Sequence, residues 1–258
     1  MEGLTEDSSG EIPPNLLDLQ EIPGWQEKGV SQDEPVPFNI RKEAMKEAAL
    51  SFGARGGLAR RTFEIRAEIE RRRNYLDKVY DFRQLLIAAP SGLVIEPPIV
   101  SESLDALLIS NSGTEAAVAD TIYNINRNAR IVSAARTWRQ YLERDWGKVE
   151  PPPDILRPRD NEERQYWREL ISQGWAEGYK QADEVFEQDL LELNAHFQGM
   201  VRYKQLLAKG MITPPYTMMV DRGVSGGGEE MKVGDRAIRM TGLPTLTPRT
   251  KEWQPVNP

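Results

Sequence analysis

The sequence of 258 residues contains no cysteine, which excludes disulfide bonds, thiol catalysis and thiolate metal sites. No window approaches eighteen consecutive apolar residues, so we expect no membrane-spanning helix. The first residues, MEGLTEDSSGEIPPNLL, include neither a basic n-region nor an apolar h-region. We therefore expect either a cytosolic protein or a chain whose export signal has been removed.

Catalytic motifs are also missing. The single histidine, His196, lies near Asp189 and Glu192 on a predicted helix, where helical spacing gives at most a two-ligand corner for a metal ion. There is no HExxH motif and no strand-flanked G-x-S-x-G motif. Three carboxylate pairs are interpreted as solvated faces: Glu162 with Glu163, Glu187 with Asp189, and Glu229 with Glu230. We expect a protein that is not an enzyme, without catalytic residues, metal or cofactor.

The formal net charge of −7 argues against attraction of nucleic acid or anionic lipid to the surface as a whole. One dense basic patch departs from this average. Its members are Arg60, Arg61 and Arg71–Arg73. The interleaved acids Glu64, Glu68 and Glu70 favour ion pairs one helical turn apart. The alternative function is a nucleic-acid-binding module that uses these arginines.

The stretch SFGARGGLARRTFEI, residues 51–65, places three glycines beside arginines at the start of a helical pattern. It matches neither G-x-x-x-x-G-K-[ST] nor G-x-G-x-x-G, and no apolar strand precedes it. The preceding residues, 40–52, show helical periodicity instead. The pattern therefore favours a bend or close-packing point between two helices, 39–52 and 57–79, over a phosphate-binding loop.

The most periodic part of the sequence predicts a helix over 160–209, either straight or bent at Gly199. Asp160 followed by Glu163 predicts a capping box at its start. The G-x-x-x-G spacing in GWAEGYKQA, residues 174–182, predicts close approach of another backbone. The aromatic residues around this motif are interpreted as core residues.

Strand signals are shorter. A strand is expected at Leu93–Ile95, and the prolines that follow it, Pro97 and Pro98, place it at a sheet edge. Antiparallel hairpins are expected near 121–133 and 216–240. The second region is interpreted as two linked hairpins or a three-stranded meander, separated by SGGG and GD.

Together these patterns predict an α+β fold with a helix-dominated body of long amphipathic helices, small antiparallel hairpins and extended N- and C-terminal arms. Residues 1–38 are interpreted as an extended, acidic, proline-rich arm, and residues 39–258 as a single α+β domain ending in an extended tail. Aromatic residues in such arms are typical anchors for partners. The candidate partner contacts are Trp25, Trp253, Arg60 and Arg61.

Four motifs carry a resemblance to a known family. They are TWRQYL at 137–142, GWAEGYKQADEVF at 174–186, GMVRYKQLLAKGMI at 199–212 and DRAIRMTGLPTLTP at 235–248. In this order they resemble the DotC family of Dot/Icm-type (type IVB) secretion systems and IncI-type conjugation systems. The stretch GARGGLARRTFEI is similar to that family's N-terminal glycine motif, and the similarity covers residues 40–254.

The resemblance implies a structural subunit of an outer-membrane core complex. DotC-like proteins are outer-membrane lipoproteins that face the periplasm, and with a DotD-like lipoprotein they help a DotH-like subunit to reach and insert at the outer membrane. We therefore expect these two partners, a multi-copy ring and a location at the periplasmic face of the bacterial outer membrane. The family normally begins with a signal peptide and a lipidated cysteine, so a lipid anchor is expected in the full-length precursor.

Overall fold

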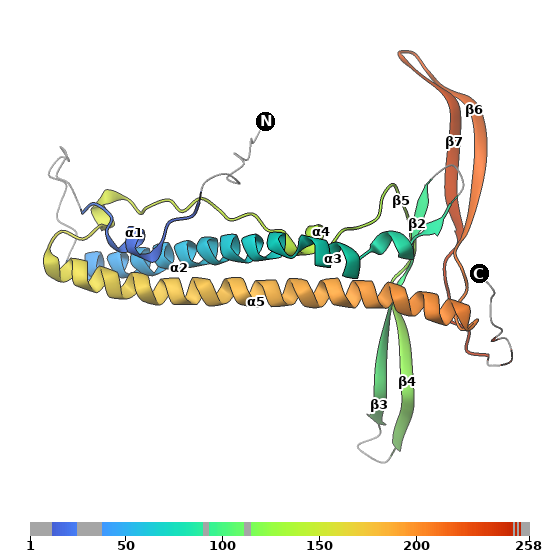
Figure 1. The fold of residues 1–258 in the computed structure, drawn as a ribbon, viewed down its shortest axis with the longest axis horizontal. Helices are drawn as coiled ribbons and strands as arrows, with labels where there is room; N and C mark the ends of the chain where they lie inside the picture. Colours follow the sequence, from blue (N-terminus) through green and yellow to red (C-terminus); the bar gives the residue numbers. More distant parts are fainter. Residues whose placement is uncertain are drawn as a thin grey trace. The chain divides into compact units, whose positions relative to one another are not determined.

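The computed structural model describes residues 12–24, 38–89, 93–110, 115–249, 251 and 253 (Figure 1). The fold is α+β, as predicted. Its helices are α1 (Leu16–Gln20), α2 (Phe38–Arg71), α3 (Arg73–Val79), α4 (Arg139–Leu142) and α5 (Asn161–Ala208), with the short 3-10 helices η1 (Phe82–Leu85) and η4 (Asp154–Leu156). Its strands are β1 (Ile87–Ala88), β2 (Val94–Glu96), β3 (Ile99–Ser110), β4 (Glu115–Arg127), β5 (Arg130–Val132), β6 (Tyr216–Gly227) and β7 (Glu230–Gly242).

The chain divides into two compact units. Unit 1 comprises Met1–Tyr75 and Tyr141–Leu190, and unit 2 comprises Leu76–Gln140 and Leu191–Pro258. The sequence-based division into an arm and one domain stays a prediction, because residues 25–37 lie outside the described part of the chain. No helix in that described part is both long and apolar enough to cross a membrane.

Helix α5 confirms the prediction of a helix over 160–209. The Glu163 N–H donates to Asp160 Oδ1 at 2.8 Å, so Asp160 caps the first turn. The Glu163 carboxylate in turn accepts from the Arg159 N–H at 2.7 Å, one residue before the position that a capping box uses. The first part of α5 belongs to unit 1 and its last part to unit 2.

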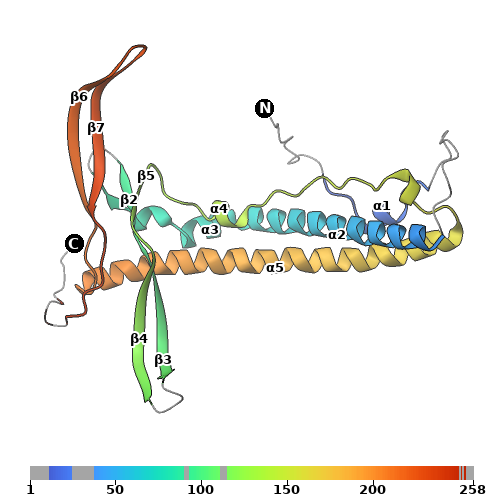
Figure 2. The same ribbon diagram turned by 180° about the vertical axis from the view of Figure 1, so that it is seen from behind.

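In unit 1 the predicted joint between two helices is wrong, because α2 continues through the glycines (Figure 2). A Cβ at Gly53 would lie 3.1 Å from the Ile171 Cα, and one at Gly57 would lie 3.0 Å from the Trp175 carbonyl carbon. The glycines lower helix propensity by about 1 kcal/mol each relative to alanine. They are nevertheless required here, since any side chain would push α5 away. The close-packing alternative of the same prediction is confirmed.

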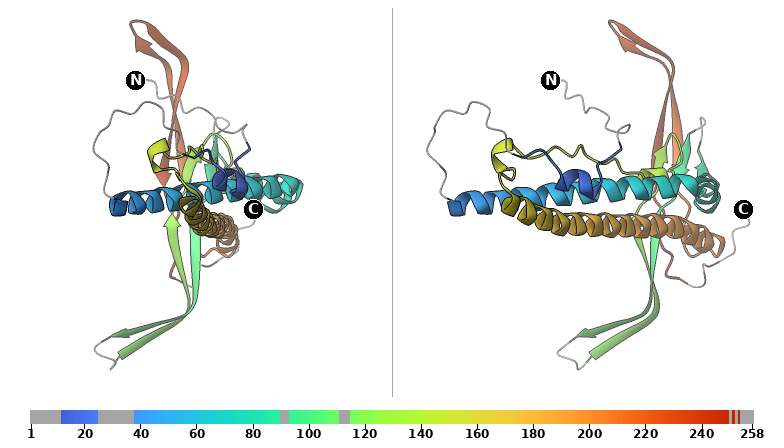
Figure 3. Two further views of the ribbon diagram at one scale, coloured as in Figure 1. Left: turned by 90° about the vertical axis from the view of Figure 1, so that its left-hand side faces the viewer. Right: turned by 60° about the vertical axis from the view of Figure 1, so that its left-hand side comes forward.

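Glycines of α5 make the reciprocal contact. A Cβ at Gly174 would lie 3.0 Å from the Leu50 carbonyl carbon, and a Cβ at Gly178 would lie 2.9 Å from the Ala54 Cα. Figure 3 shows α2 running beside the first part of α5. The close approach predicted from GWAEGYKQA is therefore confirmed, and its partner is α2 of the same chain.

The core of unit 1 includes the N-terminal segment. The described part of the predicted extended arm contains a helical turn, α1, whose Leu19 is 1% exposed. The Trp167 Nε1–H donates to the Leu19 carbonyl at 3.3 Å, which fixes this turn on α5. The remaining members of the cluster are Ile22, Met45, Ala49, Phe52, Leu170 and Ile171. Leu19 and Ile22 thus dock this segment on the body of unit 1, and the expected extended conformation is wrong only for the helical turn α1.

Unit 2 contains a three-stranded sheet of order β1-β2-β5, all antiparallel. Strand β2 is central, so the expected edge position is wrong. Pro97 and Pro98 follow β2 and therefore remove no hydrogen bond from its ladder. The hairpin expected near 121–133 is also wrong in its pairing, since β4 pairs with β3 and β5 pairs with β2.

The C-terminal strands form one long hairpin, β6–β7, in place of two linked hairpins or a meander. The turn lies in the glycine run, where Gly228 has a φ of 65°. The expected second turn at GD is instead an irregularity within β7: Gly234 has a φ of 73°, and the register shifts opposite it between Asp221 and Val224. A glycine-aspartate pair can produce either feature, and the long ladder decides between them.

Helix α4, which lies within the TWRQYL motif, is a single helical turn. The tail after β7 is partly fixed, because Leu246 forms an antiparallel bridge with Ile212. Ile212 belongs to the core cluster of unit 2, with Val100, Tyr203 and Leu206, and the partly buried Leu246 packs against this cluster.

Candidate interaction surfaces

Hairpin β6–β7 exposes apolar side chains on both of its faces. Val224 and Val233 are directly paired across the strands and are 63% and 74% exposed. Met231 lies on the same face as Val233, two residues away, and is 73% exposed. Nearer the base of the hairpin, the successive residues Met218 and Met219 point to opposite faces and are also exposed. Antiparallel sheets normally pack one face on a core, whereas both faces of this hairpin carry exposed apolar side chains.

Hairpin β3–β4 shows a similar exposure. Leu104 on β3 is 68% exposed, and Val118 on β4 is 72% exposed. The register pairs Leu104 with Thr121 and Leu107 with Val118. Figure 1 draws β3–β4 and β6–β7 as two separate ribbons. A two-stranded hairpin is only marginally stable alone in water, so both surfaces are suited to completion by another chain.

The base of β3 is held on the last part of α5. A Cβ at Gly199 would lie 3.1 Å from the Val100 backbone nitrogen, so glycine allows the strand to lie against the helix. Arg202 donates to the Val100 carbonyl at 2.8 Å and to the Glu102 carboxylate at 3.0 Å. The free end of the hairpin is therefore presented from a fixed base.

A buried ion cluster joins the sheet to the segment after β5. Glu96 is 2% exposed and accepts hydrogen bonds from Arg136 at 2.9 Å and from Arg130 at 3.1 Å. Burial by itself would raise the pKa of Glu96. The hydrogen bonds and charges of the two arginines outweigh burial and hold this pKa below its ordinary value of 4.5. These hydrogen bonds connect β2 to β5 and to the segment after β5, so the cluster holds the sheet together.

The structure places the arginine patch in intramolecular ion pairs, as the helical spacing predicted. Arg60 lies 2.9 Å from the Glu64 carboxylate. Arg61 lies 2.7 Å from Asp183 and also donates to the Tyr179 hydroxyl at 3.3 Å. The three downstream arginines pair with acids on the same or the adjacent helix: Arg71 and Arg72 with Glu68, and Arg73 with Glu70. This pairing does not favour nucleic-acid binding.

The hydrogen bonds around Glu64 alter two pKa values. Burial acts to raise the pKa of Glu64, but hydrogen bonds from Tyr179 and Arg60 lower it overall. The same bond to Glu64, 2.6 Å long, raises the pKa of Tyr179. Arg60 and Arg61 as partner contacts stay a prediction, and any partner would meet them in these pairs.

Of the two candidate anchor tryptophans, the structure describes only Trp253. Trp25 lies outside the described residues. Trp253 is 39% exposed, and its Nε1–H donates to the Thr247 carbonyl at 2.7 Å. Its indole is therefore oriented by the tail itself while a large part of its surface remains accessible, which is suited to the predicted role as an anchor.

The acidic and histidine side chains considered as metal or acid–base groups, Asp189 and His196, lie in intramolecular contacts. Asp189, expected on a solvated face, is 9% exposed and pairs with Arg144 at 2.8 Å, so that expectation is wrong for it. His196 lies 3.7 Å from Glu192 and 3.5 Å from Arg136. Burial is the largest cause that lowers the pKa of His196. Within the described ranges, no group of three or more histidine or acidic side chains is placed to hold a metal ion.

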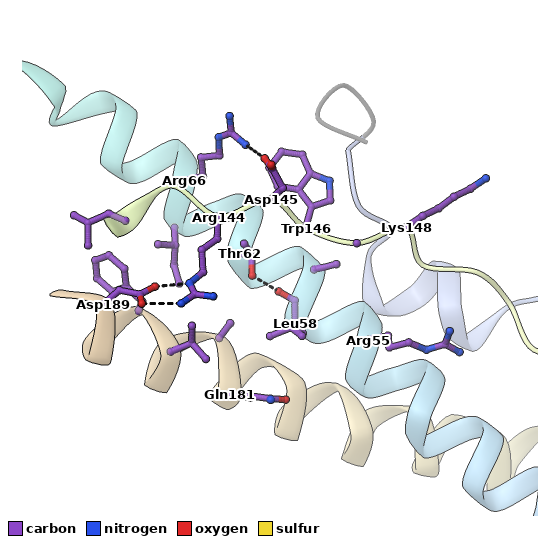
Figure 4. A pocket seen from close by; sticks show the side chains of 17 residues that line it. Arg55, Leu58, Thr62, Arg66, Arg144, Asp145, Trp146, Lys148, Gln181 and Asp189 are labelled. Carbon is purple, nitrogen blue, oxygen red and sulfur yellow. Dashed lines mark hydrogen bonds and ion pairs between the residues drawn. The ribbon is translucent and has the colours of Figure 1, made fainter. Parts of the chain in front are cut away.

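Unit 1 also contains a pocket of about 280 Å³ (Figure 4). Residues of α2, of the segment 142–148 and of α5 line it. The Arg144–Asp189 pair lies on one side, and Arg66 pairs with Asp145 at 2.6 Å on another. Sequence reasoning did not identify this pocket, because its three walls are far apart in the chain and each consists of ordinary amphipathic residues.

Sequence reasoning also missed the exposed hairpin faces. The run YTMMV at 216–220 gave a strand signal, but alternation alone does not tell whether the apolar face meets a core. A usable signal was present, since apolar residues at successive positions, Met218 and Met219, must point to both faces.

Comparison with known protein families gives a match. Residues 39–255 match the model of a protein family described as "Type IV secretory system, conjugal DNA-protein transfer". No curated protein matches the chain.

Proposed function

The chain belongs to the family of type IV secretory system proteins of conjugal DNA–protein transfer, and from this premise we propose that it is a structural subunit with a DotC-like role. In this role it assembles the outer-membrane core complex of a type IVB secretion or conjugation system. Its activity is binding to other subunits, without catalysis.

The exposed apolar faces of hairpin β6–β7 are the observation that supports this proposal best. Val224, Met231 and Val233 gather on one face of a ribbon that packs on nothing in the described part of the chain. An exposed apolar patch of this kind marks a site for another protein. The free edges of a two-stranded ribbon also offer backbone N–H and C=O groups to an added strand.

The proposed partners come from the motif resemblance. They are a DotD-like lipoprotein and a DotH-like outer-membrane subunit, bound at the periplasmic face of the outer membrane in a multi-copy ring. A lipid anchor in the full-length precursor would hold the chain at this membrane. Trp253 and the unpacked hairpin faces are the surfaces proposed to meet these partners.

The test is purification of the tagged protein from native envelope membranes, with mass spectrometry of its companions. Wild type is expected to retain both partner subunits. Val233→Lys is expected to lose at least one of them, because a charge on the apolar face opposes burial against a partner. Ile155→Lys is the matched control, since Ile155 is 51% exposed in unit 1 and outside the hairpins.

Two results would contradict the proposal. One is a wild-type preparation that contains no secretion-system subunit. The other is normal arrival of the DotH-like subunit at the outer membrane in cells that lack this protein.

A further inference from the structure

The pocket in unit 1 has the size of a side-chain site. Its volume is about 280 Å³, just below the range of roughly 300–1,000 Å³ that small-molecule and cofactor sites occupy. The apolar residues of its lining are Leu58, Ala59, Ile65, Leu142, Ala182, Val185 and Phe186. It is therefore suited to one or two large apolar side chains.

The acids of the pocket are already neutralised. Asp189 lies against Arg144, and Asp145 lies 2.6 Å from Arg66. Arg66 also stacks over the Trp146 ring, 5.6 Å from its centroid, which fixes this side of the pocket. These pairs add little net charge, so an incoming carboxylate would meet no unpaired acid in the lining.

Two further cations in the lining have no acidic partner among the described residues. Arg55 is exposed and makes only a 3.4 Å contact to the Ser51 carbonyl, and Lys148 is exposed with no ion pair to any described residue. Both line the pocket. In Figure 4 they lie toward the same end of the view, whereas Arg144 and Asp189 lie toward the other. The pocket thus combines an apolar interior with positive charge at one end.

We propose that this pocket binds an acidic, apolar peptide segment of a partner subunit. A large apolar side chain of the segment fills the interior, and carboxylates one to three residues away pair with Arg55 and Lys148. Burial of the apolar side chain supplies most of the affinity, and the charges select the partner. The identification of the donor as a subunit of the same secretion complex rests on the proposed function.

The binding test uses purified protein and a displayed library of random peptides. Wild type is expected to enrich peptides that combine Leu, Phe or Met with Asp or Glu within three residues. An enriched peptide, labelled with fluorescein, then serves as the probe for affinity. The double variant Arg55→Glu/Lys148→Glu is expected to bind this probe about tenfold more weakly, a loss of about 1.4 kcal/mol that is within what two exposed ion pairs contribute. A probe whose acids are changed to lysine should restore binding to the double variant.

Two controls define the site. Lys209→Glu changes the charge in unit 2, at a lysine whose side chain contacts no acid of the described chain, and is expected to leave affinity unchanged. Val185→Phe fills the pocket and should abolish binding while the melting temperature stays within a few degrees of wild type. If Val185→Phe unfolds the protein, the charge reversal and its rescue still decide the outcome.

The proposal is overturned if no acidic apolar motif is enriched, or if affinity is equal in wild type and the double variant. Binding of phosphatidylglycerol vesicles in place of peptides, or self-association that Val185→Phe abolishes, would also overturn it, since lipid or a second copy would then be the occupant. Co-purification from envelope membranes separates this result from the proposed function. If wild type retains both partner subunits but enriches no acidic apolar peptide, only the pocket proposal fails.

Discussion

The helix pair of unit 1 and the hairpin β6–β7 of unit 2 use small and apolar residues in opposite ways. In the helix pair, Gly57 and Gly178 bring the two backbones so close that no side chain fits between them. In the hairpin, Val224 and Val233 face each other across the strands but remain 63% and 74% exposed. The helix pair buries its contact surface within one chain, whereas the hairpin leaves apolar surface exposed for another chain to cover.

This difference shows which part of the molecule is expected to depend on partners. Burial of apolar area stabilises a fold by about 25 cal/mol per Å². The helix pair obtains this free energy from contacts within the chain, whereas the hairpin obtains it only when a partner covers its faces. Substitutions in the two regions should therefore differ in what they damage: stability of the isolated protein in the first, assembly in the second.

The largest effect is expected from Gly178→Ala. The added methyl group would lie 2.9 Å from the Ala54 Cα, with the Ala54 carbonyl nearer still, and neither backbone can yield without moving a helix. We expect the free energy of unfolding to fall by about 3 kcal/mol, measured by urea titration. Gly227→Ala is the control, because a Cβ there meets nothing within 4 Å. Equal effects at both positions would refute the close packing of α2 on α5.

A somewhat smaller effect is expected from Glu96→Gln. It removes the charge that Arg130 and Arg136 share, and should lower the free energy of unfolding by about 2 kcal/mol at pH 7. Because the folded-state pKa of Glu96 is held below 4.5, the stabilisation is complete above pH 4.5 and is lost as pH falls through the folded value. The difference between wild type and variant should therefore shrink below pH 4.5.

The control for this experiment is Glu230→Gln, an exposed carboxylate 3.4 Å from Lys232. Its effect should be small at every pH. A difference between wild type and Glu96→Gln that does not depend on pH would mean that packing, rather than charge, holds the cluster.

The sequence predicted the elements better than their pairing. Helix α5 was readable because Asp160 marks its start and an apolar face recurs over the whole segment. The strands near residues 121–133 were readable as β-prone runs, but their partners lie earlier in the chain, at β2 and β3. Local propensity has no information on such non-local pairing. The continuous α2 was missed for the same reason, since only the facing helix explains glycines at Gly53 and Gly57.

The candidate site was predictable only in part. The local pairing of Arg60 with Glu64 follows from helical spacing. The partner of Arg61, Asp183, comes from another helix and could not be read from spacing. The exposure of Val224 and Val233 could not be predicted either, because a strand pattern does not tell whether another element covers the apolar face.

A gain in stability of about 1 kcal/mol is expected from Tyr203→Phe. The Tyr203 hydroxyl is buried in the core of unit 2 with no hydrogen-bond partner in the described part of the chain. Burial raises the pKa of Tyr203 to about 12. Removing an unsatisfied hydroxyl relieves its desolvation cost. Tyr80→Phe is the counterpart: its hydroxyl donates to Asn194 at 2.6 Å, so its loss should cost about 1 kcal/mol. Thermal unfolding of both variants tests the pair of signs, and a loss of stability in both would show that Tyr203 has a partner.

The smallest effect on the free energy of unfolding is expected from Val233→Thr, on the exposed face of the hairpin. The substitution keeps a β-branched side chain, so the β6–β7 ladder is retained, and the exposed hydroxyl remains in water. The free energy of unfolding of the isolated protein should change by less than about 0.5 kcal/mol. Val100→Thr makes the same change at a residue that is 0% exposed and should cost about 2 kcal/mol, because its hydroxyl enters the core of unit 2. Equal losses at the two positions would mean that the Val233 face is already covered within one chain, and the hairpin would then have no apolar surface left for a partner.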